Sequence, residues 1–170
     1  MKAFLLRTFL AGGAVLALVA HSNATAQAQG LMTTHRVPAA LANEAVGAAV
    51  DTCKGKGFAV SAVVVDASGA RQALLRGDNA GIHTLDSAGD KAYTSASFKA
   101  NSAAVRERLM ANPQASGLAV LPNVLMVGGG VPIKVGEEVI GGIGVGGTPS
   151  AETDEQCAQA GIDKIKDHLK

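Results

Sequence analysis

The order of the predicted elements indicates an α+β domain built around an antiparallel sheet. Along the chain they are a helix, two strands, two helices, three strands and a final helix. Strands that follow one another directly, with helices grouped before, between and after them, are typical of this class. Aromatic residues make up only 3% of the chain and Trp is absent. We therefore expect one domain whose core is made by Ala, Val, Ile and Leu.

The first 28 residues have the pattern of a secretory signal peptide. Lys2 and Arg7 form a positive segment, an apolar run follows at 9–20, and small residues alternate at 24–28. The apolar run is shorter than the ~20 residues that a membrane span requires. We therefore predict an exported protein, periplasmic or secreted, with residues 1–28 as signal peptide and 29–170 as a single domain. The alternative is an uncleaved membrane anchor.

The charge pattern argues against a nucleic-acid partner. The chain has 15 basic and 14 acidic residues. Cleavage of the signal peptide would remove Lys2 and Arg7, so the mature protein would have one basic residue fewer than acidic residues and a net charge near −1. A polyanion-binding protein would show a basic stripe and aromatic platforms for base stacking. Here the basic residues are scattered and aromatic residues are rare, so no nucleic-acid partner is expected.

The first half of the domain predicts a helix followed by a hairpin. Residues 38–54 have the apolar spacing of an amphipathic helix, which glycines then stop. Residues 58–65 have the composition of a strand. The turn residues of 66–69 reverse the chain into a second strand at 71–76.

Two helices are expected next. Thr84 or Asp86 can cap a helix that runs to about Phe98, and Ser102 can cap another that ends before Pro113. We expect this pair to connect the two groups of strands.

The second half predicts three short strands and a helix. The strands lie near 123–127, 131–135 and 139–145, so the sheet is expected to hold about five strands in all. Residues 153–156 form a capping box that would begin the last helix. The apolar side of that helix is made by Cys157, Ile162, Ile165 and Leu169.

Two cysteines remain in the mature chain. Cys53 lies in the last turn of the first helix and Cys157 near the start of the last one. In an oxidising compartment such a pair predicts a disulfide, and the two helices would bring the cysteines together if they packed side by side. Closing so long a loop would stabilise the fold by roughly 4 to 5 kcal/mol. The alternative is two buried thiols. Metal binding is not expected, because neither cysteine has a partner at ligand spacing.

Two glycine-rich motifs favour a structural role. Residues 142–147 satisfy the dinucleotide pattern GxGxxG, but the chain ends before a full βαβ unit could follow. We expect these glycines to let another element or subunit lie close to the backbone. Gly128, Gly129 and Gly130 either expose amide groups toward an anion or form a turn, and the turn is the favoured interpretation.

Charged and histidine side chains that could form a functional site cluster around one loop and the beginning of one helix. Arg76, Asp78 and His83 stand close together in the sequence, and Lys91 follows in the next helix. His35 and His168 are expected at the surface. His83 differs from them because charged residues stand near it in the sequence. No nucleophile elbow, zinc-binding HExxH pair or paired-carboxylate motif occurs in the chain, so no catalytic residue is assigned.

Six motifs in order resemble the GlcG/HbpS-like haem-binding family, which also occurs as the C-terminal domain of PduO-type proteins. They are Ala-Val-Val-Val-Asp at 62–66, Arg-Gly-Asp-Asn-Ala-Gly at 76–81, Lys-Ala-Tyr-Thr at 91–94, Gly-Gly-Gly-Val-Pro-Ile at 128–133, Ile-Gly-Gly-Ile-Gly-Val at 140–145 and Asp-Glu-Gln-Cys-Ala at 154–158. The resemblance implies a profilin-like α/β sandwich, oligomers from dimer to octamer, and binding of haem or a corrinoid. It also implies that some members degrade, sense or store haem.

The resemblance points to a set of pocket residues. They are Arg76, Asp78, His83, Lys91, Gly129, Gly130 and Pro132. Arg76 or Lys91 would bind the haem propionates, and His83 is the predicted axial ligand of the iron. Tyr93 and Met126 are the alternative ligands.

We therefore predict an exported, oligomeric, haem-binding protein, with haem favoured over a corrinoid and with a carrier, storage or sensing role rather than turnover. One alternative is an accessory protein or enzyme for a small hydroxy-carboxylate, in which His83 would move a proton. Another is a structural or signalling oligomer with a membrane sensor as its partner.

Overall fold

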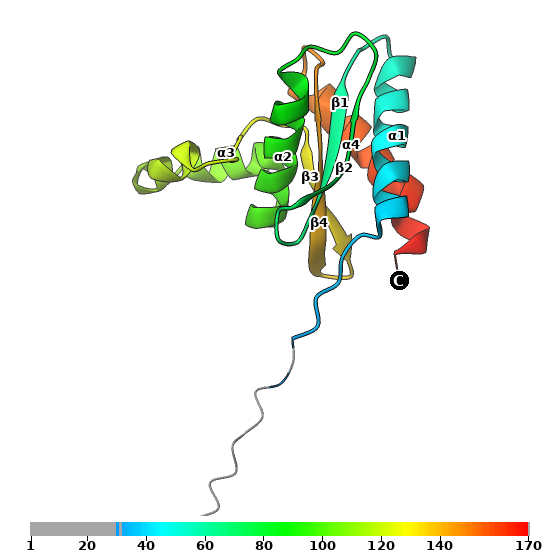
Figure 1. The fold of residues 1–170 in the computed structure, drawn as a ribbon. Coiled ribbons are helices and arrows are strands. Elements are labelled where there is room, and N and C mark those ends of the chain that lie inside the picture. The colour runs from blue at the N-terminus through cyan, green and yellow to red at the C-terminus, as the bar shows by residue number, and fades with distance from the viewer. Residues whose placement is uncertain (1–29, 31, 170) are drawn as a thin grey trace, which may run out of the picture. The chain divides into compact units, whose positions relative to one another are not determined.

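The computed structural model describes residues 30 and 32–169, and it confirms the α+β class. One antiparallel sheet has the strand order β2-β1-β4-β3 (Figure 1). The strands are β1 (Ser61–Asp66), β2 (Arg71–Arg76), β3 (Gly130–Val135) and β4 (Glu138–Gly146). The predicted signal peptide lies outside the described residues. Within the described part of the chain, no helix is long and apolar enough to cross a membrane.

The prediction of a strand at 123–127 is wrong, and the sheet has four strands rather than five. The backbone of this segment is hydrogen-bonded to helix side chains instead of to a neighbouring strand. The amide of Leu125 donates to Thr94 Oγ1 at 2.8 Å, and the carbonyl of Val127 accepts from Ser102 Oγ at 2.7 Å. Asn123, with φ of 62°, also departs from extended geometry.

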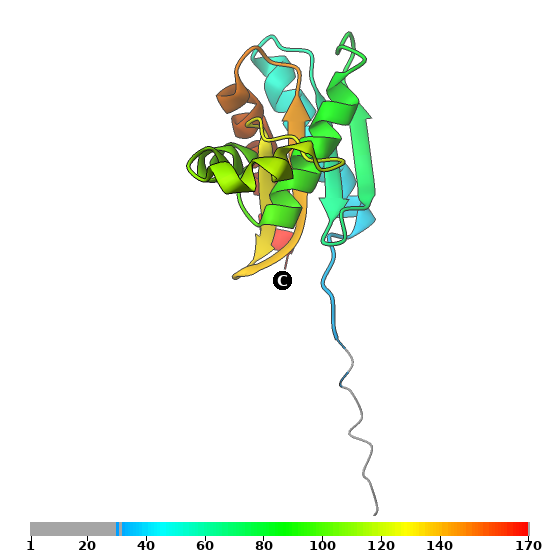
Figure 2. The same ribbon diagram turned by 90° about the vertical axis from the view of Figure 1, so that its left-hand side faces the viewer.

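Helices cover both faces of the sheet (Figures 1 and 2). Alternate residues of β1 belong to different layers: Ala62 and Val64 pack with one core cluster, and Val63 and Val65 with the other. Because both faces are covered, the whole of β1 is buried. The helices are α1 (Ala39–Gly55) and α4 (Ala151–Ile165) on one face, α2 (Thr84–Phe98) on the other, then α3 (Ser102–Met110) and the 3-10 helices η1 (Pro113–Val120) and η2 (Lys166–His168).

Three of the expected helix caps are replaced by others. Ser150, not Thr153, caps α4, and its hydroxyl accepts from the amide of Thr153 at 3.4 Å. Neither Thr84 nor Asp86 is the N-cap of α2, because His83 occupies that position. Ser102 is buried inside the first turn of α3, where its hydroxyl accepts from the amide of Gly130 at 2.9 Å. The hydroxyl of Ser102 thus binds distant backbone instead of capping its helix, whereas Thr84 Oγ1 donates to the nearby carbonyl of Gly81 at 2.7 Å.

Helix α2 lies directly against a glycine-lined face of β4. A Cβ atom on Gly144 would meet the carbonyl oxygen of Ala88, and one on Gly142 would meet that of Ala92. At Gly146 an added Cβ would lie 2.7 Å from Ser87 Oγ. The expectation that these glycines permit close approach is confirmed, and their neighbour is α2.

Replacing Gly144 with alanine should separate this helix from the sheet. Because the added methyl group meets helix backbone, which cannot move independently, we expect Gly144→Ala to lower the free energy of unfolding by about 3 kcal/mol. Urea denaturation of the purified variant measures this. The control is Gly47→Ala in α1, where a Cβ would meet nothing within 4 Å. That change should stabilise the protein by roughly 0.5 to 1 kcal/mol. Equal effects of the two substitutions would contradict the proposed contact.

The opposite layer is held by the predicted disulfide. Cys53 of α1 and Cys157 of α4 are bonded, with a Cα–Cα distance of 5.7 Å, and both residues are fully buried. Gly161 of α4 faces α1 closely, since its added Cβ would lie 2.6 Å from the carbonyl oxygen of Ala45. The side-by-side packing of the first and last helices is therefore confirmed.

Removal of the disulfide should destabilise the fold without changing its topology. The two cysteines are separated by 104 residues. Restoring the entropy of so long a loop to the unfolded chain should cost roughly 4 to 5 kcal/mol in Cys53→Ala/Cys157→Ala. Chemical denaturation followed by circular dichroism measures this loss. Wild-type protein kept reduced during unfolding and refolding should match the variant, and a variant as stable as the oxidised protein would contradict the prediction.

Candidate functional site

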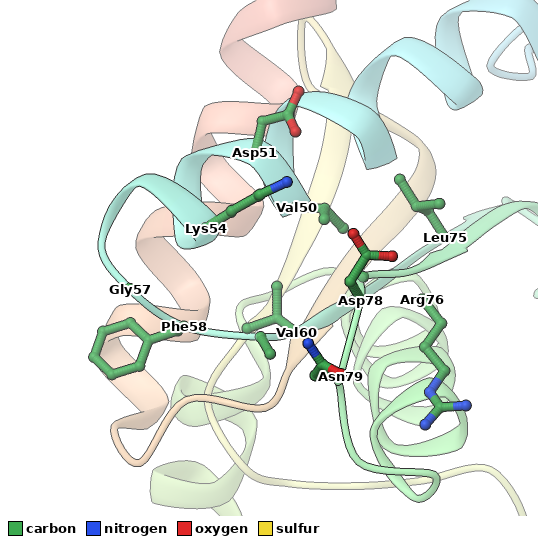
Figure 3. A pocket seen from close by; sticks show the side chains of 12 residues that line it. Val50, Asp51, Lys54, Gly57, Phe58, Val60, Leu75, Arg76, Asp78 and Asn79 are labelled. Carbon is green, nitrogen blue, oxygen red and sulfur yellow. The ribbon is translucent and has the colours of Figure 1, made fainter.

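The main cavity of the described structure lies beside the C-terminal end of α1 and has a volume of about 510 Å³. Its walls come from the last turns of α1, the connection to β1, and the end of β2 with the loop that follows (Figure 3). Apolar side chains and charged groups share these walls. The lining residues are Val50, Asp51, Lys54, Gly57, Phe58, Ala59, Val60, Leu75, Arg76, Gly77, Asp78 and Asn79.

A tight turn at the end of α1 forms one wall. Gly57 has a φ of 85°, a left-handed conformation that glycine adopts without strain. The amide of Phe58 then donates to the carbonyl of Cys53 at 3.0 Å, so the chain folds back on the helix end. This turn brings Phe58 and Val60 to the cavity and connects its wall directly to the residue that forms the disulfide.

The opposite wall is a loop that Arg76 stabilises. Its Nε donates to the carbonyl of Ala80 at 2.9 Å, and its Nη2 donates to the same oxygen. The amide of Gly77 donates to the carbonyl of Val60 at 2.9 Å, which joins the two walls. Figure 3 shows the guanidinium of Arg76 pointing away from Asp78. Within the described part of the chain, no ion pair joins these two residues.

His83 belongs to the same loop but does not line the cavity. It is the exposed N-cap residue of α2, and its ring lies over Gly81, whose added Cβ would be 2.8 Å from His83 Cε1. Among the hydrogen bonds and ion pairs of residues 32–169, none involves the imidazole of His83. Its ring nitrogens are therefore available to a ligand from solvent.

Lys91 lies elsewhere, inside the protein. Its ammonium is 2.8 Å from Asp154 Oδ2 and 3.0 Å from the carbonyl oxygen of Val145, and the Lys91 and Asp154 side chains are 6% and 3% exposed. The second carboxylate oxygen of Asp154 accepts from the amide of Thr148 at 3.1 Å. The charge pair is thus buried and has hydrogen-bond partners on both sides.

The glycine turn packs around this pair. Gly129 has a φ of 118°, and a Cβ there would lie 2.8 Å from Asp154 Cβ and 3.0 Å from Lys91 Nζ. A Cβ on Gly130 would meet the carbonyl oxygen of Lys91. Gly128 lies in a bend and Gly130 is the first residue of β3, so the motif forms a bend that leads into the strand. Pro132 lies in β3, opposite Gly142.

The predicted site residues therefore separate into two groups. Arg76 and Asp78 contact the cavity, with His83 on the same loop. Lys91 and Gly129 lie beside Asp154 inside the fold, and Gly130 packs on the backbone of Lys91. None of the three is among the residues that line the cavity.

Comparison with known proteins decides the family. A family model described as "Haem degrading protein HbpS-like" matches residues 37–163. This chain belongs to the HbpS-like family. The comparison with curated proteins gave no match.

Three solved structures support the assignment to the HbpS-like family. A double mutant of HbpS from Streptomyces reticuli is 34% identical, with a TM-score of 0.75 over 91% of this chain and 97% of that one. The ORFY protein of Klebsiella pneumoniae is 26% identical, with a TM-score of 0.71 over 81% of this chain and 98% of that one. The PduOC:Heme complex is 25% identical, with a TM-score of 0.69 over 77% of this chain and 96% of that one.

Several cavity residues of this HbpS-like protein were not predicted. Val50, Lys54 and Phe58 reach the site only because α1 packs beside β2, which local sequence patterns do not reveal. Asp154 was also missed, because its partner Lys91 is 63 residues away in the sequence. The only signal in the sequence that could have identified Asp154 was its polar side chain at a position of the last helix that otherwise makes apolar contacts.

The alternative ligands Tyr93 and Met126 also lie away from the cavity lining. The ring of Tyr93 packs on Gly69, whose added Cβ would lie 2.5 Å from Tyr93 Cε2. Met126 is partly buried in the segment between η1 and β3. Among the described residues, no group of three or more His, Cys, Asp or Glu side chains could hold a metal ion.

Two carboxyl groups at the far end of β1 have shifted pKa values. Burial raises the pKa of Asp66, but hydrogen bonds from Ser68 and Ala70 and the charge of Arg36 outweigh it, so this pKa lies below its usual range. Burial raises the pKa of Asp90 above its usual range, although the charge of Arg71 opposes the shift. Asp66 fixes the β1–β2 turn, because its Oδ1 accepts from Ser68 and Ala70.

Breaking the buried charge pair should strongly destabilise this HbpS-like fold. Lys91→Met leaves the carboxylate of Asp154 without its cation, and such a loss costs about 3 to 5 kcal/mol. Lys91→Met/Asp154→Leu should recover part of this loss, because no unpaired charge remains buried. Urea denaturation of both variants provides the test. Lys166→Met is the control, since its ion pair with Asp163 is exposed and should contribute little. A double variant less stable than Lys91→Met would contradict the explanation.

Proposed function

We propose that this chain is an exported, oligomeric haem-binding protein that carries, stores or senses haem. The match to the HbpS-like family carries the proposal, and the haem complex of the related PduO domain supports it. Export is supported by the predicted signal peptide and by the disulfide, because disulfides persist in oxidising compartments.

The cavity beside α1 is the proposed haem site. Its volume of about 510 Å³ falls within the range of roughly 300 to 1,000 Å³ that is usual for ligand pockets. Leu75 is 39% exposed and Phe58 is partly exposed, so both offer apolar surface for the macrocycle, whereas Val50 and Val60 are buried in the core behind the cavity wall. The ammonium of Lys54 points into this cavity (Figure 3) and would attract a propionate. The residues present therefore fit a flat apolar ligand with acidic groups at its edge.

Arg76 and His83 would complete the site from the loop. The guanidinium of Arg76 has five N–H donors and uses its contacts to Ala80 for only part of them, so donors remain for a second propionate. His83 lies outside the cavity lining, so it would supply an imidazole to the iron where the macrocycle extends beyond the cavity along this loop. A bound haem would supply the redox chemistry of the site. Lys91, Gly129, Gly130 and Pro132 would support the fold behind the site rather than contact the ligand.

A haemin titration followed at the Soret band tests this proposal. We expect saturable binding near one haem per subunit, and we expect His83→Ala to weaken binding by at least tenfold or to shift the band, since the iron loses a ligand. His35→Ala and His168→Ala are matched controls, because both histidines are exposed and neither lines this cavity. They should bind haem as the wild type does.

Each other outcome has a defined meaning. An unchanged His83→Ala variant beside a weakened His35→Ala or His168→Ala variant would place the iron ligand at the other end of the molecule. Weak, non-saturating binding by the wild type would overturn haem as the ligand and favour a small carboxylate.

Haem degradation is the second candidate function, because the matching family is described as haem-degrading. The same haem-loaded protein distinguishes the two when it is incubated with oxygen and a reductant such as ascorbate. A stable Soret band supports binding without turnover. Its decay together with release of iron to a chelator would support degradation.

A further inference from the structure

The large flexible apolar side chains of this protein are not part of its fully buried core. The fully buried core consists of Ala, Val, Ile and the two cysteines, and every leucine and methionine in the described part of the chain is at least partly exposed. Leucine and methionine are normally among the most buried residue types. Single exposed side chains need no explanation, but a group of them marks an interaction surface.

Half of these leucines and methionines, together with two exposed valines, lie on one projecting segment, residues 102–127, which we call the arm. It contains α3, η1 and the chain that leads toward β3. Figures 1 and 2 show α3 leaving the end of α2 and extending away from the sheet. Its exposed apolar residues are Val120 (84%), Met110 (71%), Leu121 (45%), Val127 (41%) and Leu118 (37%).

These side chains do not hold the arm on its own domain. η1 has no buried residue, and α3 buries only Ser102 and Val105. The arm is attached at its base, where Ser102 Oγ bonds to Val127 and Gly130. Within the described residues, the apolar surface of the arm is therefore uncovered and can contact a partner.

The absence of charge on the part of the arm that follows α3 favours a second copy of this chain as that partner. Residues 111–133 contain no ionisable side chain. A two-fold axis brings a patch against itself, which is repulsive for a charged patch and complementary for an uncharged apolar one. Arg106, Glu107 and Arg108 are exposed on α3 beside the patch and provide both signs of charge for a polar rim.

The area of the arm is sufficient for such a contact. Five side chains with these exposures present on the order of 500 Å² of apolar surface per copy. Two facing patches would then bury roughly 1,000 Å², the lower limit for a specific interface. A lipid surface fits less well, because helices that lie on membranes carry a basic polar face, and η1 has no charge.

We propose that the arm is the contact through which two copies of this chain associate, with apolar face against apolar face. The inference rests on the oligomeric part of the proposed function and names the surface responsible. It does not depend on haem, because the arm contributes no residue to the lining of the cavity beside α1.

Val120→Glu tests this contact by placing a charge in the apolar patch. Val120 is 84% exposed, so the change should not disturb the fold, which circular dichroism verifies. In sedimentation velocity at micromolar concentration, we expect the wild type to be oligomeric and the variant to dissociate at least tenfold more readily. Ile82→Glu is the matched control, because Ile82 is also 84% exposed but lies outside the arm. It should sediment as the wild type does.

Met110→Glu gives a second reading of the arm if Val120→Glu fails to fold. A wild type that is monomeric, or an arm variant that associates as tightly as the wild type, would overturn the proposal. Dissociation by Ile82→Glu alone would also overturn it and move the interface to the loop that precedes α2. Monomers that pellet with anionic vesicles would replace the second copy by a membrane. Haemin titration of the same samples separates the two proposals, since loss of haem binding with an intact oligomer would contradict only the proposed function.

Discussion

Direct contact between the backbone of α2 and the glycine-lined face of β4 is the constraint on which the rest of the structure depends. Because Gly142 and Gly144 carry no side chains, the helix lies against the strand itself, and the ammonium of Lys91 reaches past the sheet to Asp154 and the carbonyl of Val145. This charge pair connects α2 to the first turn of α4. A residue larger than glycine at Gly129 would crowd the pair, because its Cβ would lie 2.8 Å from Asp154 Cβ and 3.0 Å from Lys91 Nζ.

The position of the candidate site follows from this contact. Once α2 is fixed, its N-terminus at His83 is fixed as well, and the loop that begins at Arg76 must span the distance from the end of β2. Arg76 orders that loop through Ala80, and Gly77 joins it to Val60 on the facing wall. The opposite wall depends on α1, which the disulfide at Cys53 holds to α4. Both walls are therefore positioned by the rigid layers behind them.

A core of small side chains has a cost in apolar area. Ala, Val and Gly allow helices and sheet to approach closely, but each contributes little burial at about 25 cal/mol per Å². The buried cross-link between α1 and α4 offsets part of this deficit by restricting the unfolded chain. The leucines and methionines that could have filled a larger core lie on the surface, many of them on the arm. Association through that surface would add burial that one copy does not achieve alone.

Local patterns in the sequence determined most of the elements. The strand at 71–76 and the helices at 84–98 and near 39–55 follow from apolar periodicity and turn residues. The disulfide between Cys53 and Cys157 follows from the places of the two cysteines on the first and last helices. The family followed from six ordered motifs.

Tertiary structure alone decided that 123–127 is not a strand, that Lys91 bonds to Asp154, and that Lys54 and Phe58 line the cavity. Each of these depends on a partner from a distant part of the chain, and a buried charge or backbone group takes whichever partner the packed layers bring within reach.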